Sequence, residues 1–288
     1  MGFLLIILNN AAHQVEGMLT RRYGNKHGAG GMFFNAVVCL FSMLFFVLTD
    51  RDGFYFPGAL WIYGGISCLC FATGFYGMYR ALQLGSYVIS RLISSFSGVL
   101  VIFYGLFYLG EDANLFQYIS IVLVFLSLFI MNYEKPRKGE EKEKFSFGWL
   151  AWVLASLVAN AFIAILQREQ QIKFDNQCDN EFMILSLGGA FLALLVIGLA
   201  KERDQIGSVV KYGTLYGAGA GLMNGAANLV GLWTYYYIPI SAASPIRTGV
   251  GTVMSFLVSW LIYREKFSKQ KLVGVFLGLV AVVISQIG

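Results

Sequence analysis

The sequence predicts an all-α integral membrane protein with ten transmembrane helices, arranged as two inverted five-helix repeats. Three observations support this fold class: the composition, a series of ten apolar runs, and a pair of matching stretches in the two halves. Hydrophobic residues make up 57% of the 288 residues, charged residues only 13%, and the mean hydropathy is +0.66. Such a chain has too little polar surface to coat a soluble globule.

The ten apolar runs are the expected spans. A helix that crosses a bilayer needs about 20 apolar residues, because a helix satisfies its own backbone hydrogen bonds in hydrocarbon. The runs predict helices at 3–21, 31–49, 57–83, 86–109, 114–133, 147–170, 182–200, 213–237, 241–263 and 269–287. The first run carries polar residues and no cleavage site follows it, so it is expected to be a span rather than a signal peptide.

The matching stretches are Leu109-Gly110-Glu111 and Tyr263-Arg264-Glu265, each of which precedes a final apolar run. Five spans in each half is an odd number, so the second half is expected to enter the membrane upside down. We therefore expect a first repeat at 1–133, a charged, solvated linker at 134–146 and a second repeat at 147–288, which together form one integrated transport domain. Inverted repeats are typical of alternating-access carriers.

The distribution of Lys and Arg predicts the orientation. Sixteen of the 21 lie in connections after odd-numbered spans, and three lie on the opposite side. Under the positive-inside rule, both termini would then face outward. The net charge of +5 is explained by loops that face anionic lipid, so no nucleic-acid partner is expected.

An enzyme is not expected from this sequence. Cys39, Cys68 and Cys70 lie in apolar spans, where a free cysteine behaves as a small hydrophobe, and Cys178 lies in a connection. No zinc spacing, phosphate-binding glycine loop or nucleophile motif occurs. The sequence therefore predicts no catalytic residues, no metal and no cofactor.

The first helix carries a polar stripe. Asn9, His13, Glu16 and Thr20 lie at positions i, i+4, i+7 and i+11, which places them on one helix face. An acid at membrane depth costs a few kcal/mol and usually faces a wet interior, where low polarity favours its neutral form. Glu16 is therefore expected to face the transport path and to couple transport to protons. A structural hydrogen-bonded cluster, or snorkelling toward Arg21, is the alternative.

Similar stripes occur in the second half. On the sixth helix, Asn160 and Gln167 have the same spacing as Asn9 and Glu16 on the first helix. The counterpart of Glu16 is thus the neutral Gln167, so a cavity shared by both halves would contain a single titratable carboxyl. On the eighth helix, Asn224 and Asn228 offer donors and acceptors either to a ligand or to a neighbouring helix. The glycines of the same helix predict a packing seam; they are Gly217, Gly219, Gly221 and Gly225.

Arginine and aromatic side chains complete the candidate site. Arg91 and Arg247 lie inside the fourth and ninth helices; Arg91 could snorkel to head groups, whereas Arg247 follows Ser244-Pro245 and could fork onto a carboxylate or phosphate. These arginines favour an anionic or zwitterionic substrate. Tyr76, Arg80 and Gln83 share one face of the third helix, and Trp233 begins an aromatic cluster that could stack on a planar substrate or an organic cation.

Several of these segments resemble the drug/metabolite transporter superfamily, EamA-like ten-helix branch. The resemblance is carried by Ala81-Leu82-Gln83-Leu84-Gly85-Ser86, by the two stretches around Glu111 and Glu265, and by Gly274 and Gly278. Glu16 followed by Arg22 is also similar to the first helix of the small multidrug resistance relatives. The chain departs from the family pattern around Asn9 to His13, where a Trp-Gly pair is common, and near Ser95, where a proline is common. The resemblance implies cytoplasmic termini, opposite to the charge distribution.

Together these observations predict a secondary transporter in the cytoplasmic membrane. The expected substrate is a small organic metabolite, zwitterionic or amphipathic, such as an amino acid or a related compound, moved by alternating access with Glu16 protonation as the coupling step. The alternatives are an exporter of organic cations or drugs and a passive pore or lipid scramblase. One chain supplies a complete site, so a monomer is expected, with a dimer as the alternative.

Overall fold

The computed structural model describes residues 1–27, 31–50, 53–84, 90, 93–94, 96–112, 115–132, 146–262, 264 and 269–284. Of these residues, 89% are helical, and none of them forms a strand. Arg91, most of the charged linker, Gly85-Ser86, Ser95, Tyr263 and Glu265 lie outside the described residues.

The described helices follow the predicted order. The first half contains α1 (Gly2–His27), α2 (Met32–Thr49), α3 (Gly58–Leu84), α5 (Ser97–Phe103) continued by the π-helix η1 (Tyr104–Tyr108), and α6 (Leu115–Asn132). The second half contains α7 (Phe147–Lys173), α8 (Asp179–Lys201), α9 (Arg203–Ser208), the π-helix η2 (Val209–Gly213), α10 (Thr214–Thr234), α11 (Ile240–Leu261) and α12 (Lys269–Ile284).

A helix lies at each of the ten positions expected from hydropathy, with differences in their bounds. The fourth, expected at 86–109, is described as a continuous helix from Ser97 to Tyr108, and the eighth ends at Thr234. The first helix extends to His27 instead of ending at residue 21, and the eighth span is preceded by α9 and η2 instead of a loop. Residues 203–212 are mostly exposed and partly charged, so a helix there carries no apolar signal. By length and composition, α2, most of α3, α7 and α8 could each cross a membrane.

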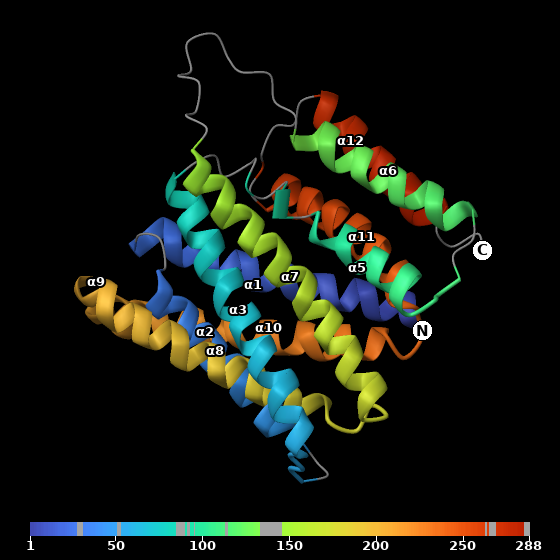
Figure 1. Ribbon diagram of the computed structural model, residues 1–288. Coiled ribbons are helices and arrows are strands. Elements are labelled where there is room, and N and C mark those ends of the chain that lie inside the picture. Colours follow the sequence, from blue (N-terminus) through green and yellow to red (C-terminus); the bar gives the residue numbers. More distant parts are fainter. Residues whose placement is uncertain are drawn as a thin grey trace.

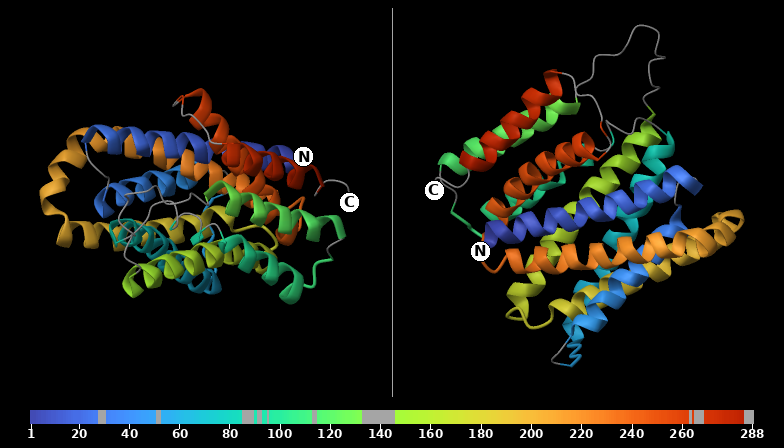
Figure 2. Two further views of the ribbon diagram at one scale, coloured as in Figure 1. Left: turned by 90° about the horizontal axis from the view of Figure 1, so that it is seen from above. Right: turned by 180° about the vertical axis from the view of Figure 1, so that it is seen from behind.

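The helices of the two halves pack in a matching pattern. Helix α1 packs on α10 as α7 packs on α3, α10 packs on α2 as α3 packs on α8, and α1 packs on α11 as α7 packs on α5. Three further pairs join corresponding helices: α2 with α8, α5 with α11, and α6 with α12. Helices α6 and α12 run together at the edge of the bundle (Figures 1 and 2).

The glycines of α10 form the predicted packing seam. A Cβ built on Gly217, Gly221 or Gly225 would come within 2.5–2.8 Å of atoms of α2. Gly219 points elsewhere, toward Leu19 of α1 at 3.0 Å. The absence of side chains therefore lets α10 approach helices on two sides, which brings its asparagines close to α1 and α2.

Glu111 joins the end of η1 to the beginning of α11. Its carboxylate accepts hydrogen bonds from the backbone N–H groups of Ile240 (3.1 Å) and Ser241 (2.9 Å). A negative charge at a helix N-terminus satisfies free donors and complements the helix dipole. Gly110 has a φ of +65°, and a Cβ on Gly105 would lie 2.6 Å from Glu111 Oε2. The Leu-Gly-Glu motif therefore positions α11; we call these two hydrogen bonds of Glu111 the clamp.

Candidate functional site

A central cavity of about 230 Å³ lies between α5, α7, α11 and the turn after α10. Three residues predicted from the sequence, Asn160, Ser244 and Arg247, meet at this cavity. Its lining consists mainly of neutral polar groups and one cation; it comprises Ser97, Gly98, Val101, Asn160, Ala164, Tyr235, Ser244, Arg247 and Thr248.

Arg247 carries the only formal charge among these lining residues. Its guanidinium carbon lies 5.2 Å from the ring centroid of Tyr235, over the ring face, which is a cation–π arrangement. Its Nε and Nη2 atoms are buried and have no hydrogen-bond partner within the described part of the chain. The single ion pair found among the described side chains joins His13 and Glu16, so no described acid neutralises Arg247.

Two hydrogen bonds position the turn of α11 that carries Arg247. The Thr248 hydroxyl donates to the carbonyl of Ser244 (3.0 Å), and the Ser244 hydroxyl donates to the carbonyl of Gly98 on α5 (3.3 Å). On the facing helix, Asn160 is exposed, and its Nδ2 lies 3.4 Å from the Ser94 hydroxyl. The cavity therefore combines one guanidinium with hydroxyl and amide groups that can turn toward a ligand.

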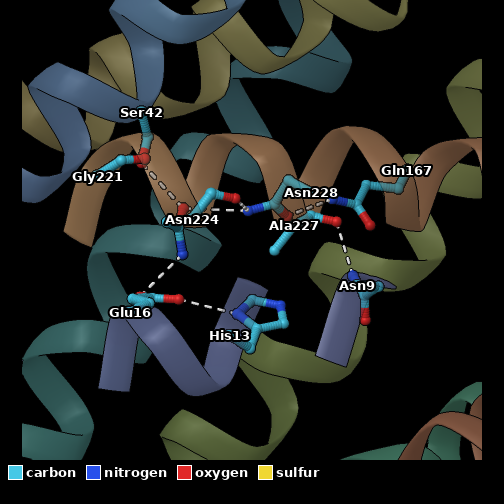
Figure 3. A network of polar contacts seen from close by, with 9 residues as sticks. All are labelled: Asn9, His13, Glu16, Ser42, Gln167, Gly221, Asn224, Ala227 and Asn228. Carbon is cyan, nitrogen blue, oxygen red and sulfur yellow. Dashed lines mark hydrogen bonds and ion pairs between the residues drawn. The ribbon is translucent and has the colours of Figure 1, made fainter. Parts of the chain in front are cut away.

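Glu16 lies in a polar network between α1 and α10 (Figure 3). One carboxylate oxygen accepts a hydrogen bond from Asn224 Nδ2 at 3.1 Å, and the other lies 2.9 Å from His13 Nδ1. The side chains of His13 and Glu16 are 42% and 19% exposed. Glu16 thus faces a neighbouring helix and keeps partial access from outside, whereas Thr20, at the end of the predicted stripe, is exposed.

The network continues from α10 to α2 and α7. Asn224 Oδ1 accepts from Ser42 (3.0 Å) and from Asn228 Nδ2 (3.1 Å), and Asn228 Oδ1 accepts from Gln167 Nε2 (3.1 Å). Gln167, which the sequence pairs with Glu16 by spacing, therefore lies at the other end of the same network (Figure 3).

Asn9 lies between this network and the cavity. Its Nδ2 donates to the carbonyl of Ala227 on α10 (2.7 Å), while its buried Oδ1 has no partner within the described residues. A Cβ built on Gly231 would lie 3.1 Å from Asn9 Nδ2 and 3.7 Å from Arg247 Nη2. Asn9 and Arg247 therefore approach the same point of α10, where a side chain larger than glycine would press against Asn9.

The remaining predicted residues lie elsewhere. Tyr76 and Arg80 line a second cavity of about 140 Å³, together with Met32, Tyr79, Gln83, Ile197, Lys201 and Glu202. Tyr76, Arg80 and Gln83 do share one face, as their spacing predicts, but that face does not reach the central cavity. Trp233 is 43% exposed and lines neither cavity.

Two features were not found by sequence reasoning. Thr248 and Ser97 line the central cavity; the spacing of Thr248 one helical turn after Ser244 was the available signal for the first. Asp179, at the start of α8, is only 8% exposed. Its carboxylate accepts hydrogen bonds from Gln170, from Gln171 and from the Tyr236 hydroxyl, which links α7, α8 and the turn after α10.

Comparison with known proteins identifies the family. The model of the EamA-like transporter family matches residues 1–133 and 147–286. A search of curated proteins finds no match. One solved crystal structure of a protein shares the fold, with a TM-score of 0.74 and 13% sequence identity over 98% of this chain and 98% of its own length.

The family match covers nearly the whole chain and agrees with the resemblance seen in the sequence. Members of this family are transporters rather than enzymes, and the apolar helices described above fit a multi-pass membrane protein. The chain belongs to the EamA-like transporter family.

Proposed function

We propose that this chain is a secondary carrier of a small organic anion or zwitterion, such as an amino acid or a related compound. The observation that carries the proposal is Arg247, a guanidinium in the central cavity whose Nε and Nη2 have no partner among the described residues. A planar guanidinium binds a carboxylate or a phosphate through two parallel hydrogen bonds. The cation–π contact with Tyr235 holds it ready for such a ligand.

The cavity favours a small, polar substrate. Its volume of about 230 Å³ lies below the range of roughly 300–1,000 Å³ that is usual for drug-sized ligands. Its lining includes the hydroxyls of Ser97, Ser244 and Thr248 and the amide of Asn160. The described lining contains no acid, which argues against an organic cation as the substrate.

Alternating access would follow from two inverted five-helix repeats. The matching pattern of helix pairs between the halves supports this arrangement, because exchanging corresponding helices reproduces the pattern. The cavity lies between α5 of the first half and α7 and α11 of the second, so rocking of the halves would open it to one side and then to the other. One chain supplies the whole lining, which is consistent with a carrier that works as a monomer in the cytoplasmic membrane.

Glu16 is the proposed proton-coupling group. It is the one carboxylate in the network that joins α1, α10 and α7, and its symmetry-related position is occupied by the neutral Gln167. Protonation would remove the charge that Asn224 and His13 now satisfy, and so would change the hydrogen bonds between α1 and α10.

The substrate class is tested by ligand stabilisation and counterflow. A thermal-shift screen of the purified protein against amino acids, organic acids, amines and sugar phosphates identifies a ligand, because specific binding stabilises the folded state. Counterflow in reconstituted vesicles then separates a carrier from a pore or a scramblase. Stabilisation by amines alone, or uptake that does not saturate and shows no counterflow, would overturn the proposal.

Proton coupling is tested by Glu16→Gln. We expect the dependence of uptake on an imposed pH gradient to disappear while substrate-driven counterflow remains, because the amide keeps the hydrogen bonds but cannot release a proton. Asp204→Asn removes an exposed acid outside the network and serves as the matched control. Unchanged pH dependence in Glu16→Gln would show that another group carries the proton.

A further inference from the structure

We propose that the second cavity is a binding site for a phosphate group, separate from the transport cavity. It lies where α3 and α8 end, and it contains two cations, Arg80 and Lys201, and two tyrosines, Tyr76 and Tyr79. This site does not depend on the proposed transport function, since none of its lining residues belongs to the central cavity.

The guanidinium of Arg80, which lines the cavity, has one nitrogen without a hydrogen-bond partner among the described residues. Its Nη1 donates to Gln83 Oε1 at 2.9 Å, which orients the guanidinium. Its Nε is buried and has no hydrogen-bond partner within the described part of the chain. A buried N–H of a charged group is costly when it is left unpaired, so this atom needs an acceptor.

Lys201 supplies the second cation. Its Nζ lies 3.0 Å from the Tyr76 hydroxyl and 5.3 Å from the centroid of the Tyr76 ring, which fixes the ammonium group beside the cavity. The Tyr76 ring is held in turn by an edge-to-face contact with Trp152 at 5.2 Å. No ion pair of Arg80 or Lys201 is found among the described side chains.

The acid in the lining is already engaged. Glu202 Oε2 accepts a hydrogen bond from the backbone N–H of Phe33 at 3.1 Å, in the first turn of α2. Gly31, which precedes that helix, has no side chain and so leaves room for the carboxylate. The charge of Glu202 thus complements the N-terminus of α2, and the two cations remain for a ligand.

These groups suit a tetrahedral oxyanion. A guanidinium edge, an ammonium group and a tyrosine hydroxyl approach from two helices, and together they can serve several oxygens of one phosphate. Two sources supply such a group: the head group of an anionic lipid and a soluble phosphate. The cavity lies near exposed apolar residues of α8, including Val196 and Leu199, where lipid chains would run.

The test measures binding by the full-length purified protein. Native mass spectrometry counts retained phosphatidylglycerol, with phosphatidylcholine as the comparison lipid, and a thermal-shift titration measures stabilisation by inorganic phosphate. Arg80→Gln and Lys201→Gln should each weaken binding by about tenfold, because each removes a charge-assisted contact. Lys211→Gln, which removes an exposed cation outside the cavity, should leave binding unchanged.

The two arms distinguish the sources. Retention of phosphatidylglycerol that both variants lose supports a lipid head group, and stabilisation by inorganic phosphate that both variants lose supports a soluble ligand. Lys201→Gln keeps the test valid if Arg80→Gln fails to fold, because Lys201 is exposed. The proposal is overturned if neither phosphatidylglycerol nor phosphate binds the wild type, or if Lys201→Gln binds both as tightly as Lys211→Gln does.

Discussion

Arg247 and Asp179 are charged side chains of the second half that have opposite surroundings. Asp179 is 8% exposed, and its carboxylate accepts hydrogen bonds from Gln170, Gln171 and Tyr236. Arg247 faces a cavity, and two of its nitrogens have no partner among the described residues. The charge of Asp179, which the protein satisfies itself, links three segments, whereas the charge of Arg247 is left unsatisfied by the described residues at a cavity, where we propose that it binds the substrate.

This comparison separates structural from functional charges by their hydrogen bonds rather than by their depth. Glu111 belongs with Asp179, since its carboxylate accepts from two backbone N–H groups of α11. If the distinction is correct, replacing a satisfied charge lowers stability, and replacing an unsatisfied one lowers transport.

The largest expected effect is that of Arg247→Gln on transport. Removing one partner of a buried charge pair costs about 2–5 kcal/mol, so the apparent kcat/KM for substrate uptake by vesicles should fall by about 30-fold or more. The melting temperature should stay the same or rise, because the wild-type guanidinium is unpaired in the absence of substrate. Full uptake by the variant would remove Arg247 from the site.

Asp179→Ala should have the next largest effect, and on stability. Its removal takes an acceptor from the buried amides of Gln170 and Gln171 and from the half-exposed Tyr236 hydroxyl, which should lower the free energy of unfolding by about 2 kcal/mol. Asp179→Asn keeps an acceptor oxygen and should lose less, and Asp204→Ala is the exposed control. Thermal unfolding in detergent measures the difference. If Asp179→Ala is as stable as the wild type but does not transport, Asp179 has a functional rather than a structural role.

Glu111→Ala should destabilise the protein by about 1 kcal/mol, the usual loss when a helix N-terminus loses its side-chain acceptor. The cause is the exposure of the Ile240 and Ser241 N–H groups. Glu111→Gln, which keeps one acceptor oxygen, should recover part of the stability in the same unfolding measurement. Equal melting temperatures for wild type and Glu111→Ala would show that the clamp contributes nothing.

A similarly small effect, on substrate binding rather than on stability, is expected for Tyr235→Leu. The loss of a cation–π contact costs about 1 kcal/mol, so the KM for uptake should rise about fivefold while Arg247 still binds the anion. Tyr235→Phe keeps the ring face and should behave as the wild type. If the KM rises as much in Tyr235→Phe as in Tyr235→Leu, the contribution comes from the hydroxyl and not from the ring face.

The helices were largely predictable because hydrocarbon demands long apolar helices, and a described helix lies at each of the ten predicted positions. Of these, α2, most of α3, α7 and α8 are clearly long and apolar enough to cross a membrane. The packing seam of α10 was predictable for a similar reason, since small residues at helical spacing permit close approach. Of the predicted site residues, Asn160, Ser244 and Arg247 were singled out because polar groups inside apolar helices stand out, and the structure places these three at one cavity.

The rest depends on tertiary neighbours that a single helix does not encode. Tyr76 and Arg80 carried the same local signal as Arg247, and only the packing of α3 against α8 places them at a different cavity. Asp179 follows a polar connection and looked like an ordinary helix-start residue, because its partners Gln170 and Tyr236 come from other elements. The Glu16 network likewise needs four helices to meet.

The Glu16 network has an electrical consequence, because it contains one carboxylate and that group shares a hydrogen bond with His13. If Glu16 is the coupling group, as proposed above, one proton crosses the membrane in each cycle by this route. A monovalent anion that crosses with that proton moves no net charge, and a zwitterion moves one positive charge. The membrane potential would then drive accumulation of the second substrate and leave the first unaffected.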